Sequence, residues 1–370
     1  MPLAGPSPAG LPKDALDTPA LMVDLDAFER NVARMAGTFR QAGVGWRPHT
    51  KGQKVPALAH RLIAAGAFGV TCAKVSEAEV MASSGIRDIL IANQVIGETK
   101  VRRLANLCTQ ADMVVAVDSV AGVAQLAAAA AEAGTRPRVV VEVDSGMGRC
   151  GVQPGQGVVD LARRVADSSS LRFAGVFGWE GHCAAIRDMD EKRAAVKTAI
   201  GKLTSSADAC RADGLPVSIV SCSGTGTYQI AATQPGITEV QAGGGVFGDV
   251  HYRDDFQVDH ECALTIVTTV VSRPNPTTLV TDGGFKTFGT THGQPEALGI
   301  PKEQITRMAF SAEHSRLVLA EPDDSIRVGD RIEFIVGYSD STVFLHDVLY
   351  GVRQGVVQAA WEIAGRGKLQ

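Results

Sequence analysis

The sequence predicts an α/β protein, a parallel (β/α)8 barrel of the TIM type with a C-terminal antiparallel β domain. Between about residues 44 and 245, short β-type runs alternate eight times with longer helical patterns. After about residue 258 the chain becomes β-rich, with turn signals at NP, VGD and RQG. Eight parallel strands separated by helices favour a closed barrel. The alternative, an open doubly wound sheet, is disfavoured because no Gly-x-Gly-x-x-Gly loop follows the early strands.

The helical pattern begins before the first barrel strand, near Leu25–Ala42. Ala-rich stretches such as VAGVAQLAAAAAEAG favour helix between the strands. Several β-type runs are almost continuously apolar, as in VVVEV, which is typical of strands covered by helices. The expected strands are Trp46–Lys51, Gly69–Lys74, Asp88–Gln94, Asp112–Asp118, Arg138–Ser145, Phe173–Glu180, Ser218–Ser223 and Thr238–Ala242.

The domain boundaries follow from the change of pattern. We expect a barrel domain at residues 20–258 and a β-rich domain at 259–370 that includes residues 1–19 and completes the active site. The Pro-, Gly- and Ala-rich start of the chain predicts a flexible lead-in rather than a signal peptide. No apolar run approaches the ~20 residues that a membrane-spanning helix needs.

Charge and cysteine usage exclude several classes of protein. Lys plus Arg is 36 and Asp plus Glu is 40, a net charge of −4 without a basic run, so neither nucleic acid nor a membrane is an expected partner. The seven cysteines are scattered singly and form no C-x-x-C pair. This pattern predicts reduced thiols in a soluble cytoplasmic protein.

Two glycine-rich loops follow the seventh and eighth predicted strands, where barrels often bind phosphate through backbone N–H groups. Glycine allows close approach of the backbone to an anion, and neighbouring hydroxyls add donors. The alternative is that these glycines only make tight turns. The candidate phosphate residues are Ser223, Gly224, Thr225, Gly226, Gly243 and Gly244.

Three more candidates stand at ends of predicted strands. Lys51 ends the first strand, and a lysine opposite a phosphate site suits a covalent bond to a phosphorylated aldehyde. Its alternatives are a solvated charge and a simple phosphate partner. Arg149 lies in the loop SGMGRCG, whose small residues would let it reach the site, or it forms a surface ion pair. His49 would contact a cofactor ring, or it is a buried core histidine.

These motifs resemble a known group of proteins. RPHTK, KVSEAE, VEVDSGMGRCGV, GTGT, TEVQAG and VGDRIEFI are similar to motifs of the fold-type III pyridoxal 5′-phosphate (PLP) enzymes of the alanine racemase superfamily. Within it, they look like the D-threonine aldolase and D-serine dehydratase branch, over nearly the whole chain. The resemblance implies that Lys51 is the Schiff-base lysine, that Arg149 lies beside the ring hydroxyl, and that Gln241 lies near the pyridine nitrogen. It also implies a homodimer.

The sequence departs from this branch at two places. Aldolases of the branch carry a His-x-Asp motif for a divalent metal (Mn²⁺, Mg²⁺ or Zn²⁺), but the matching residues here are Tyr338-Ser339-Asp340. Asp340 remains as a candidate ligand, with His346 and Asp347 close in sequence, but a neutral phenol is a poor substitute for imidazole. The second departure is Trp179-Glu180-Gly181-His182, where relatives have Tyr-His/Gln-Gly-Ser. Glu180 and His182 would supply an acid or base there, or form a loop ion pair or a local hydrogen bond.

The resemblance implies a PLP-dependent aldolase, a lyase acting on a small amino-acid substrate. It would cleave a β-hydroxy-D-amino acid to glycine, or another small amino acid, and an aldehyde, with Lys51, His182 and Tyr338 as catalytic residues. One alternative is a racemase or epimerase with Lys51 and either Tyr338 or His314 as opposing bases. A β-hydroxy-D-amino acid dehydratase is another. A PLP carrier is disfavoured, because carriers lack the β-rich extension.

Overall fold

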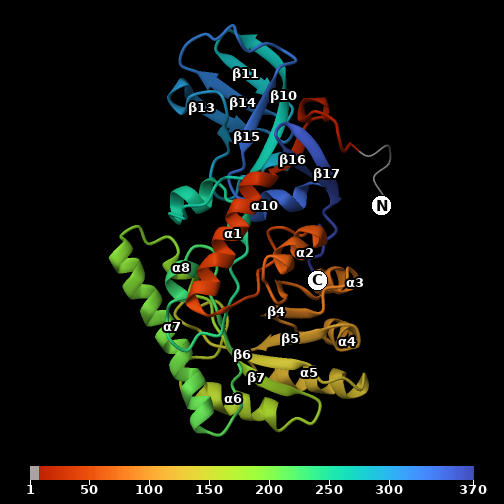
Figure 1. Ribbon diagram of the computed structural model, residues 1–370, viewed down its shortest axis with the longest axis vertical. Helices are drawn as coiled ribbons and strands as arrows, with labels where there is room; N and C mark the ends of the chain where they lie inside the picture. The colour runs from red at the N-terminus through yellow and green to blue at the C-terminus, as the bar shows by residue number, and fades with distance from the viewer. Residues whose placement is uncertain (1–7) are drawn as a thin grey trace. The chain divides into compact units, whose positions relative to one another are not determined.

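The computed structural model describes residues 8–370; residues 1–7, part of the expected lead-in, lie outside the described residues. The chain divides into two compact units (Figure 1). The barrel unit comprises residues 33–51, 56–243 and 367–370. The β unit comprises the residues up to Val32 together with 52–55 and 244–366.

The barrel unit is built on eight strands, each parallel to its neighbours. Their order is β2 (Gly45–Trp46), β9 (Glu239–Val240), β8 (Ile219–Cys222), β7 (Arg172–Phe177), β6 (Arg138–Glu142), β5 (Asp112–Val117), β4 (Asp88–Gln94) and β3 (Val70–Cys72). A parallel bridge between His49 and Thr71 joins β2 to β3, with Thr50 N–H donating to Thr71 O at 2.8 Å. The sheet therefore curls back on itself, and the predicted fold class is confirmed.

All eight expected strands are present, but β2 and β9 have only two residues each. The strands are buried because their side chains fill the interior on one face and meet helices on the other. The interior cluster includes Leu90, Val140 and Phe177. The helices of the chain up to residue 231 are α1 (Leu25–Ala42), α2 (Pro56–Ala64), α3 (Val75–Ser83), α4 (Glu98–Leu107), α5 (Val120–Glu132), α6 (Gln156–Ala166), α7 (Met189–Ala212) and α8 (Tyr228–Ala231).

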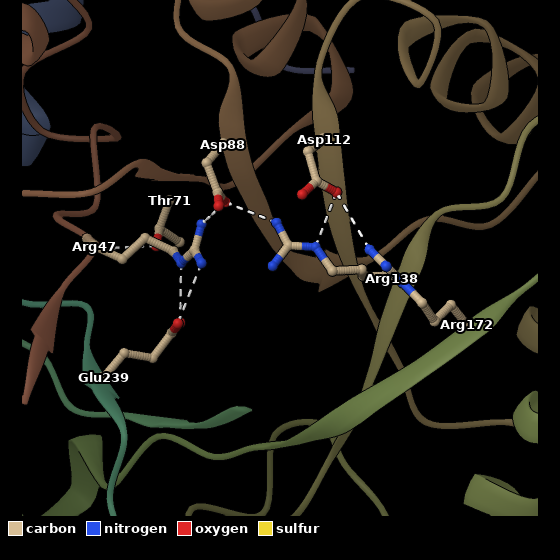
Figure 2. A network of polar contacts seen from close by, with 7 residues as sticks. All are labelled: Arg47, Thr71, Asp88, Asp112, Arg138, Arg172 and Glu239. Atoms are coloured by element: carbon tan, nitrogen blue, oxygen red, sulfur yellow. Dashed lines mark hydrogen bonds and ion pairs between the residues drawn. The ribbon is translucent and has the colours of Figure 1, made fainter. Parts of the chain in front are cut away.

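Charged side chains of alternating sign join the amino ends of the barrel strands (Figure 2). We call this set the charge ladder; its members are Glu239, Arg47, Asp88, Arg138, Asp112 and Arg172. The Arg47 side chain is only 1% exposed; its Nε lies 3.0 Å from Glu239 Oε1, and Nη1 contacts Asp88. Apart from Arg47, each member is the first residue of its strand. The ladder therefore lies at the end of the strands opposite to the loops that carry Lys51, where a barrel's residues serve stability.

The β unit contains a nine-stranded sheet. Its main order is β13 (Ile305–Phe310), β14 (Ser315–Leu319), β11 (Thr278–Thr281), β10 (Leu264–Asn275), β1 (Ala20–Asp24), β16 (Val348–Arg353) and β17 (Val356–Glu362). β15 (Arg331–Ile335) pairs with both β10 and β12 (Glu296–Ala297). Two short helices, α9 (Phe285–Phe288) and α10 (Ser339–Thr342), complete the unit.

The division of the chain differs from the expected domain boundaries at four places: residues 20–32, 52–55 and 244–258 group with the β unit, and residues 367–370 group with the barrel unit. β1 groups with the β unit, although the sequence placed residues 20–258 in the barrel domain. The reason is that β1 pairs with β10 on one side and β16 on the other. Residues 244–258 also group with the β unit, where Ala263 N–H donates to Phe247 O at 2.6 Å. Within residues 8–370, no helix has both the length and the apolar character that crossing a membrane requires.

Candidate active site

The indole ring of Trp179, just after β7, gathers residues from three other loops at the carboxyl ends of the barrel strands. Lys51 Nζ lies 5.8 Å from the ring centroid and Arg149 Cζ lies 4.7 Å from it. Both distances are within the range of a cation–π attraction. A Cβ added to Gly224 would lie 3.0 Å from Trp179 Nε1. The structure therefore brings Lys51, Arg149 and the Gly224 loop to one place, as the sequence predicted.

The segment that carries Lys51 is held between β9 and β3. His49 N–H donates to Gln241 O at 2.9 Å, and Lys51 N–H donates to His49 Nδ1 at 3.3 Å. A Cβ on Gly243 would lie 2.7 Å from His49 N and closer still to its carbonyl oxygen. Only glycine fits there, so Gly243 allows the loop after β9 to pack on the Lys51 segment.

The loop after β8 turns sharply at Ser223, which has a φ of 69°, unusual for a residue other than glycine. Ser223 Oγ and Thr227 Oγ1 are 2.9 Å apart, and Thr227 Oγ1 donates to Glu180 Oε1 at 2.5 Å. Ser223, Thr225 and Thr227 are all buried. Strained backbone of this kind is frequent where a protein binds a ligand. The loop thus has the hydroxyl and glycine content predicted for a phosphate site.

Gln241 is buried, and its Nε2 donates to Ser221 Oγ at 2.8 Å. This bond fixes a neutral amide at the carboxyl end of β9. Gly244, the other glycine predicted for phosphate, belongs to the β unit. A Cβ there would overlap the hydroxyl of Tyr252.

Arg149 lies in a loop that is stabilised by hydrogen bonds from backbone N–H groups of the loop to Asp144. The N–H groups of Gly148 and Gly146 donate to Asp144 Oδ1 at 3.0 Å each and lower the pKa of Asp144. Arg149 Nη2 lies 4.0 Å from Glu142 Oε1, and burial raises the pKa of Glu142. Arg149 is half-exposed, and it forms a long ion pair with the buried Glu142 and also contacts the ring of Trp179.

The two acid–base candidates after β7 have different environments. His182, in the 3-10 helix η2 (Gly181–Cys183), is exposed, and its Nε2 would lie 3.1 Å from a Cβ on Gly146. Glu180 is fully buried, and burial raises the pKa of its carboxyl. Glu180 makes the local hydrogen bond considered from the sequence, since its Oε1 accepts from Thr227 Oγ1.

In the β unit, Tyr338 lies among three aromatic rings. Its ring centroid is 4.9 Å from that of His251, 5.6 Å from His292 and 5.8 Å from Tyr252. Burial, with the negative charge of Asp340, raises the pKa of Tyr338. The phenol therefore keeps its proton at neutral pH.

Asp340 packs on the residue that follows Lys51 in the chain. Gly52 belongs to the β unit, and a Cβ on Gly52 would overlap Oδ1 of Asp340. Nearby, Asp249 accepts from Tyr252 N–H and Ser339 N–H, both at 2.8 Å, and burial raises the pKa of Asp249 to about 7. These bonds hold the backbone on which Tyr338 and Asp340 lie.

A hollow of about 840 Å³ in the β unit borders Tyr338 and Asp340. Its lining is mainly apolar and aromatic, with a few hydroxyls. The lining residues are Phe285, Gly289, Thr290, Thr291, His292, Met308, Ala309, Phe310, Tyr338, Asp340, Ser341, Phe344 and Leu345.

The donors around Asp340 do not fit the divalent ion that the resemblance implied. A protonated phenol replaces the imidazole ligand at position 338, and phenols are poor neutral ligands for such ions. Across residues 8–370, no three or more His, Cys, Asp or Glu side chains form a group able to hold a metal.

Two family models match the chain. Residues 23–251 match the model described as alanine racemase, N-terminal domain, and residues 263–352 match a putative serine dehydratase domain. The chain belongs to the alanine racemase N-terminal domain family. The resemblance to the alanine racemase superfamily and its aldolase and dehydratase branch is therefore confirmed.

Family members similar to this chain match it over nearly their whole length. A 3-hydroxy-D-aspartate aldolase of Paracoccus denitrificans (strain Pd 1222) is 35% identical, covering 98% of this chain and 95% of the relative. A D-threonine aldolase of Arthrobacter sp. is 35% identical, covering 99% and 97%. The crystal structure of D-threonine aldolase from Filomicrobium marinum superposes with a TM-score of 0.94 at 37% identity, covering 99% and 100%.

Sequence reasoning missed two functional features of this site. Nothing in the sequence indicated that Trp179 provides the surface shared by Lys51 and Arg149. Nor did it indicate that Glu180 is buried beneath the Ser223–Thr227 loop. A Trp-Glu pair directly after a strand was the available signal, but burial depends on the neighbouring strands.

Proposed function

We propose that this protein is a PLP-dependent lyase that cleaves a β-hydroxy-D-amino acid by a retro-aldol reaction. The products are glycine, or another small amino acid, and an aldehyde. The observation that carries the proposal is the ring of Trp179, which both Lys51 and Arg149 approach at the carboxyl ends of the barrel strands. The aldolase names of relatives that match over nearly the full chain support the choice of reaction.

The barrel residues fit PLP. Lys51 would bind it covalently, and the loops of Ser223–Thr227 and Gly243 would hold the phosphate with hydroxyl and N–H donors. Two observations support this fit: Gly243 is pressed against His49, and the Ser223 backbone is strained toward a sharp turn. When bound, PLP supplies the electron sink that cleavage of a bond at Cα requires.

The side chains around that position have distinct tasks. Arg149 would place a positive charge beside the ring hydroxyl. Gln241 would present a neutral amide toward the ring nitrogen, because its orientation is fixed by Ser221. Trp179 would cover one side of the site and exclude water.

Lys51 is tested by reduction with borohydride followed by peptide mass spectrometry. We expect the cofactor to be fixed to the peptide that contains Lys51, and Lys51→Ala to abolish both this attachment and aldehyde formation. Lys197→Ala, which removes an exposed lysine on α7, is the matched control and should behave as wild type. Attachment at another lysine would contradict the assignment.

The reaction type is tested with PLP-loaded protein and a panel of β-hydroxy-D-amino acids, following aldehyde, keto acid and deuterium exchange at Cα. Aldehyde release supports the lyase. Keto acid without aldehyde would mean the dehydratase alternative. Exchange without either product would mean the racemase or epimerase.

Tyr338 and His182 remain the predicted proton donors or acceptors. Tyr338→Phe removes a hydroxyl that keeps its proton, and we expect turnover to fall about 100-fold while PLP stays bound. The same measurement on His182→Gln tests the second candidate. Unchanged turnover in both variants would remove these two residues from the mechanism.

Two broader expectations also belong to this proposal. A homodimer should have about twice the chain mass of 38.8 kDa in sedimentation or light scattering. A cytoplasmic location agrees with seven cysteines that are all free thiols.

A further inference from the structure

Glu180 is a buried acid without a counter-charge. It is 0% exposed, and it forms no ion pair with any Lys, Arg or His of residues 8–370. Thr227 Oγ1 donates to Oε1 at 2.5 Å, whereas Oε2 is buried without a hydrogen-bond partner of standard geometry. An ionised carboxylate in such a place is costly, so burial favours the neutral acid.

The surroundings of Glu180 do not supply a cation. Glu180 interacts electrostatically with the thiols of Cys222 on β8 and Cys183 in η2, and burial raises the pKa of both thiols, that of Cys183 to about 11. The charges of Lys192 and Lys202 on α7 lower the pKa of Cys183, and the charge of Glu239 on β9 raises the pKa of Cys222. Both thiols are neutral near physiological pH, so Glu180 is the group here that can change charge.

Glu180 joins two parts of the candidate site. The ring of the adjacent residue, Trp179, makes cation–π contacts with Lys51 and Arg149. Its carboxyl accepts from Thr227, which is 2.9 Å from the Ser223 hydroxyl across the strained turn. The end of β7 and the loop after β8 are thus held together through one carboxyl group.

We propose that Glu180 is a positioning residue for the phosphate of PLP: as a neutral acid it fixes the Ser223 and Thr227 hydroxyls, and its ionisation weakens phosphate binding. This inference rests on the proposed function. Two effects act together when Glu180 loses its proton. The buried carboxylate draws both hydroxyl protons toward itself, and its negative charge repels the phosphate through a medium of low dielectric.

The experiment compares PLP with pyridoxal, which lacks the phosphate, on the cofactor-free full-length protein. Dissociation constants are measured by tryptophan fluorescence between about pH 6 and pH 9, and the ratio of the two constants isolates the phosphate contribution. Bond formation at Lys51 affects both ligands and cancels in this ratio. Ionisation of the phosphate itself occurs in every variant and cancels between variants.

In the wild type, the preference for PLP over pyridoxal should fall about tenfold more over this range than in Glu180→Gln, which stays neutral. Glu180→Gln should keep the wild-type preference at the acidic end. Thr227→Val, which removes the bridging hydroxyl, should lower the preference at every pH. Glu77→Gln, a second buried acid that accepts from Ala73 N–H, is the matched control and should follow the wild type.

The inference is overturned if Glu180→Gln retains the wild-type pH dependence, or if Thr227→Val binds PLP as the wild type does. Failure of the PLP assignment on which the proposed function depends gives a different result, since wild-type protein would then bind neither ligand covalently at Lys51. Failure of the lyase reaction alone leaves this binding experiment unchanged and is detected by the product assay. Glu180→Gln and Thr227→Val are close in size to the native side chains. Both are checked by circular dichroism before the titration.

Discussion

Two cations lie close to the ring of Trp179, Lys51 at 5.8 Å and Arg149 at 4.7 Å from its centroid. Both cations were candidates from the sequence, because Lys51 ends one predicted strand and Arg149 follows another, and barrels place functional residues at those ends. Trp179 itself was recognised only as a departure from relatives. An aromatic residue at a strand end has no motif of its own, and its role depends on which loops surround it.

Gly243 offers a sharp test of the phosphate loops. We expect Gly243→Ala to lower PLP affinity and to destabilise the fold by about 1–3 kcal/mol, because the new Cβ collides with the His49 backbone. Gly201→Ala is the control: this α7 position has open space around it, and alanine should stabilise the helix by about 0.5–1 kcal/mol. Chemical denaturation and PLP titration measure both effects. Equal behaviour of the two variants would contradict the steric argument.

Tyr338 provides a test of metal binding. We expect Tyr338→His to restore a His-x-Asp pair with Asp340 and to increase affinity for Mn²⁺ at least about tenfold, since imidazole is a far better ligand than a protonated phenol. Isothermal titration calorimetry measures the affinity, with Tyr338→Phe as the control. Tight binding of Mn²⁺ by the wild type would show that the chain holds the ion with other donors.

Among the secondary structure elements, the eight barrel strands and α1 were predicted because their patterns are local. The lengths of β2 and β9 were overestimated. Residues 48–51 were expected to continue β2, but Pro48 lacks an N–H. The segment instead forms one backbone bond to Gln241, just after β9, and two to Thr71 of β3. Because regular strand β2 ends at Trp46, Lys51 lies outside the sheet.

The charge ladder supports the strand that carries Lys51. β2 has only two residues, so the buried guanidinium of Arg47 is a main attachment of this segment to its neighbours (Figure 2). Arg47→Met leaves Glu239 buried without its partner, and we expect a loss of about 3–5 kcal/mol in the free energy of unfolding. Urea denaturation measures it.

Arg172→Ala is the control for that experiment, because Arg172 is 55% exposed and lies 3.8 Å from Asp112 at the end of the ladder. Its loss should cost no more than about 1 kcal/mol. If Arg47→Met were equally mild, the ladder would not hold β2. No local pattern indicates this role, because Arg47 lies in the RPHTK motif and its partners Asp88 and Glu239 are far away in the chain.

For the whole chain, the barrel was predictable and the membership of β1 was not. Strand 20–24 lies next to α1 in sequence, but its partners β10 and β16 come from the last third of the chain. Such pairing depends on long-range contacts that no local pattern encodes. The predicted boundary at residue 20 was based on where the barrel pattern begins. That pattern does not show which strands β1 pairs with.

The central place of β1 leads to a testable expectation. Met22 is paired with Thr265 on one side and Tyr350 on the other, so Met22→Pro interrupts both ladders of an interior strand. We expect little soluble protein and, in limited proteolysis, early cleavage within residues 264–362. Met22→Leu, a volume-conserving control, should cost less than about 1.5 kcal/mol. A soluble, protease-resistant Met22→Pro variant would show that the sheet tolerates the loss of β1.

The position of β1 also matters while the chain is being made. Residues 20–24 leave the ribosome early, but β10 begins only at Leu264 and β16 at Val348. At synthesis rates of roughly 5–20 residues per second, this apolar segment waits for its partners for about ten to fifty seconds. During that time the nascent chain carries an unpaired strand that a chaperone or a neighbouring polypeptide can bind. Yield in a cell should therefore depend on translation speed and on chaperone supply, even where the finished protein is stable.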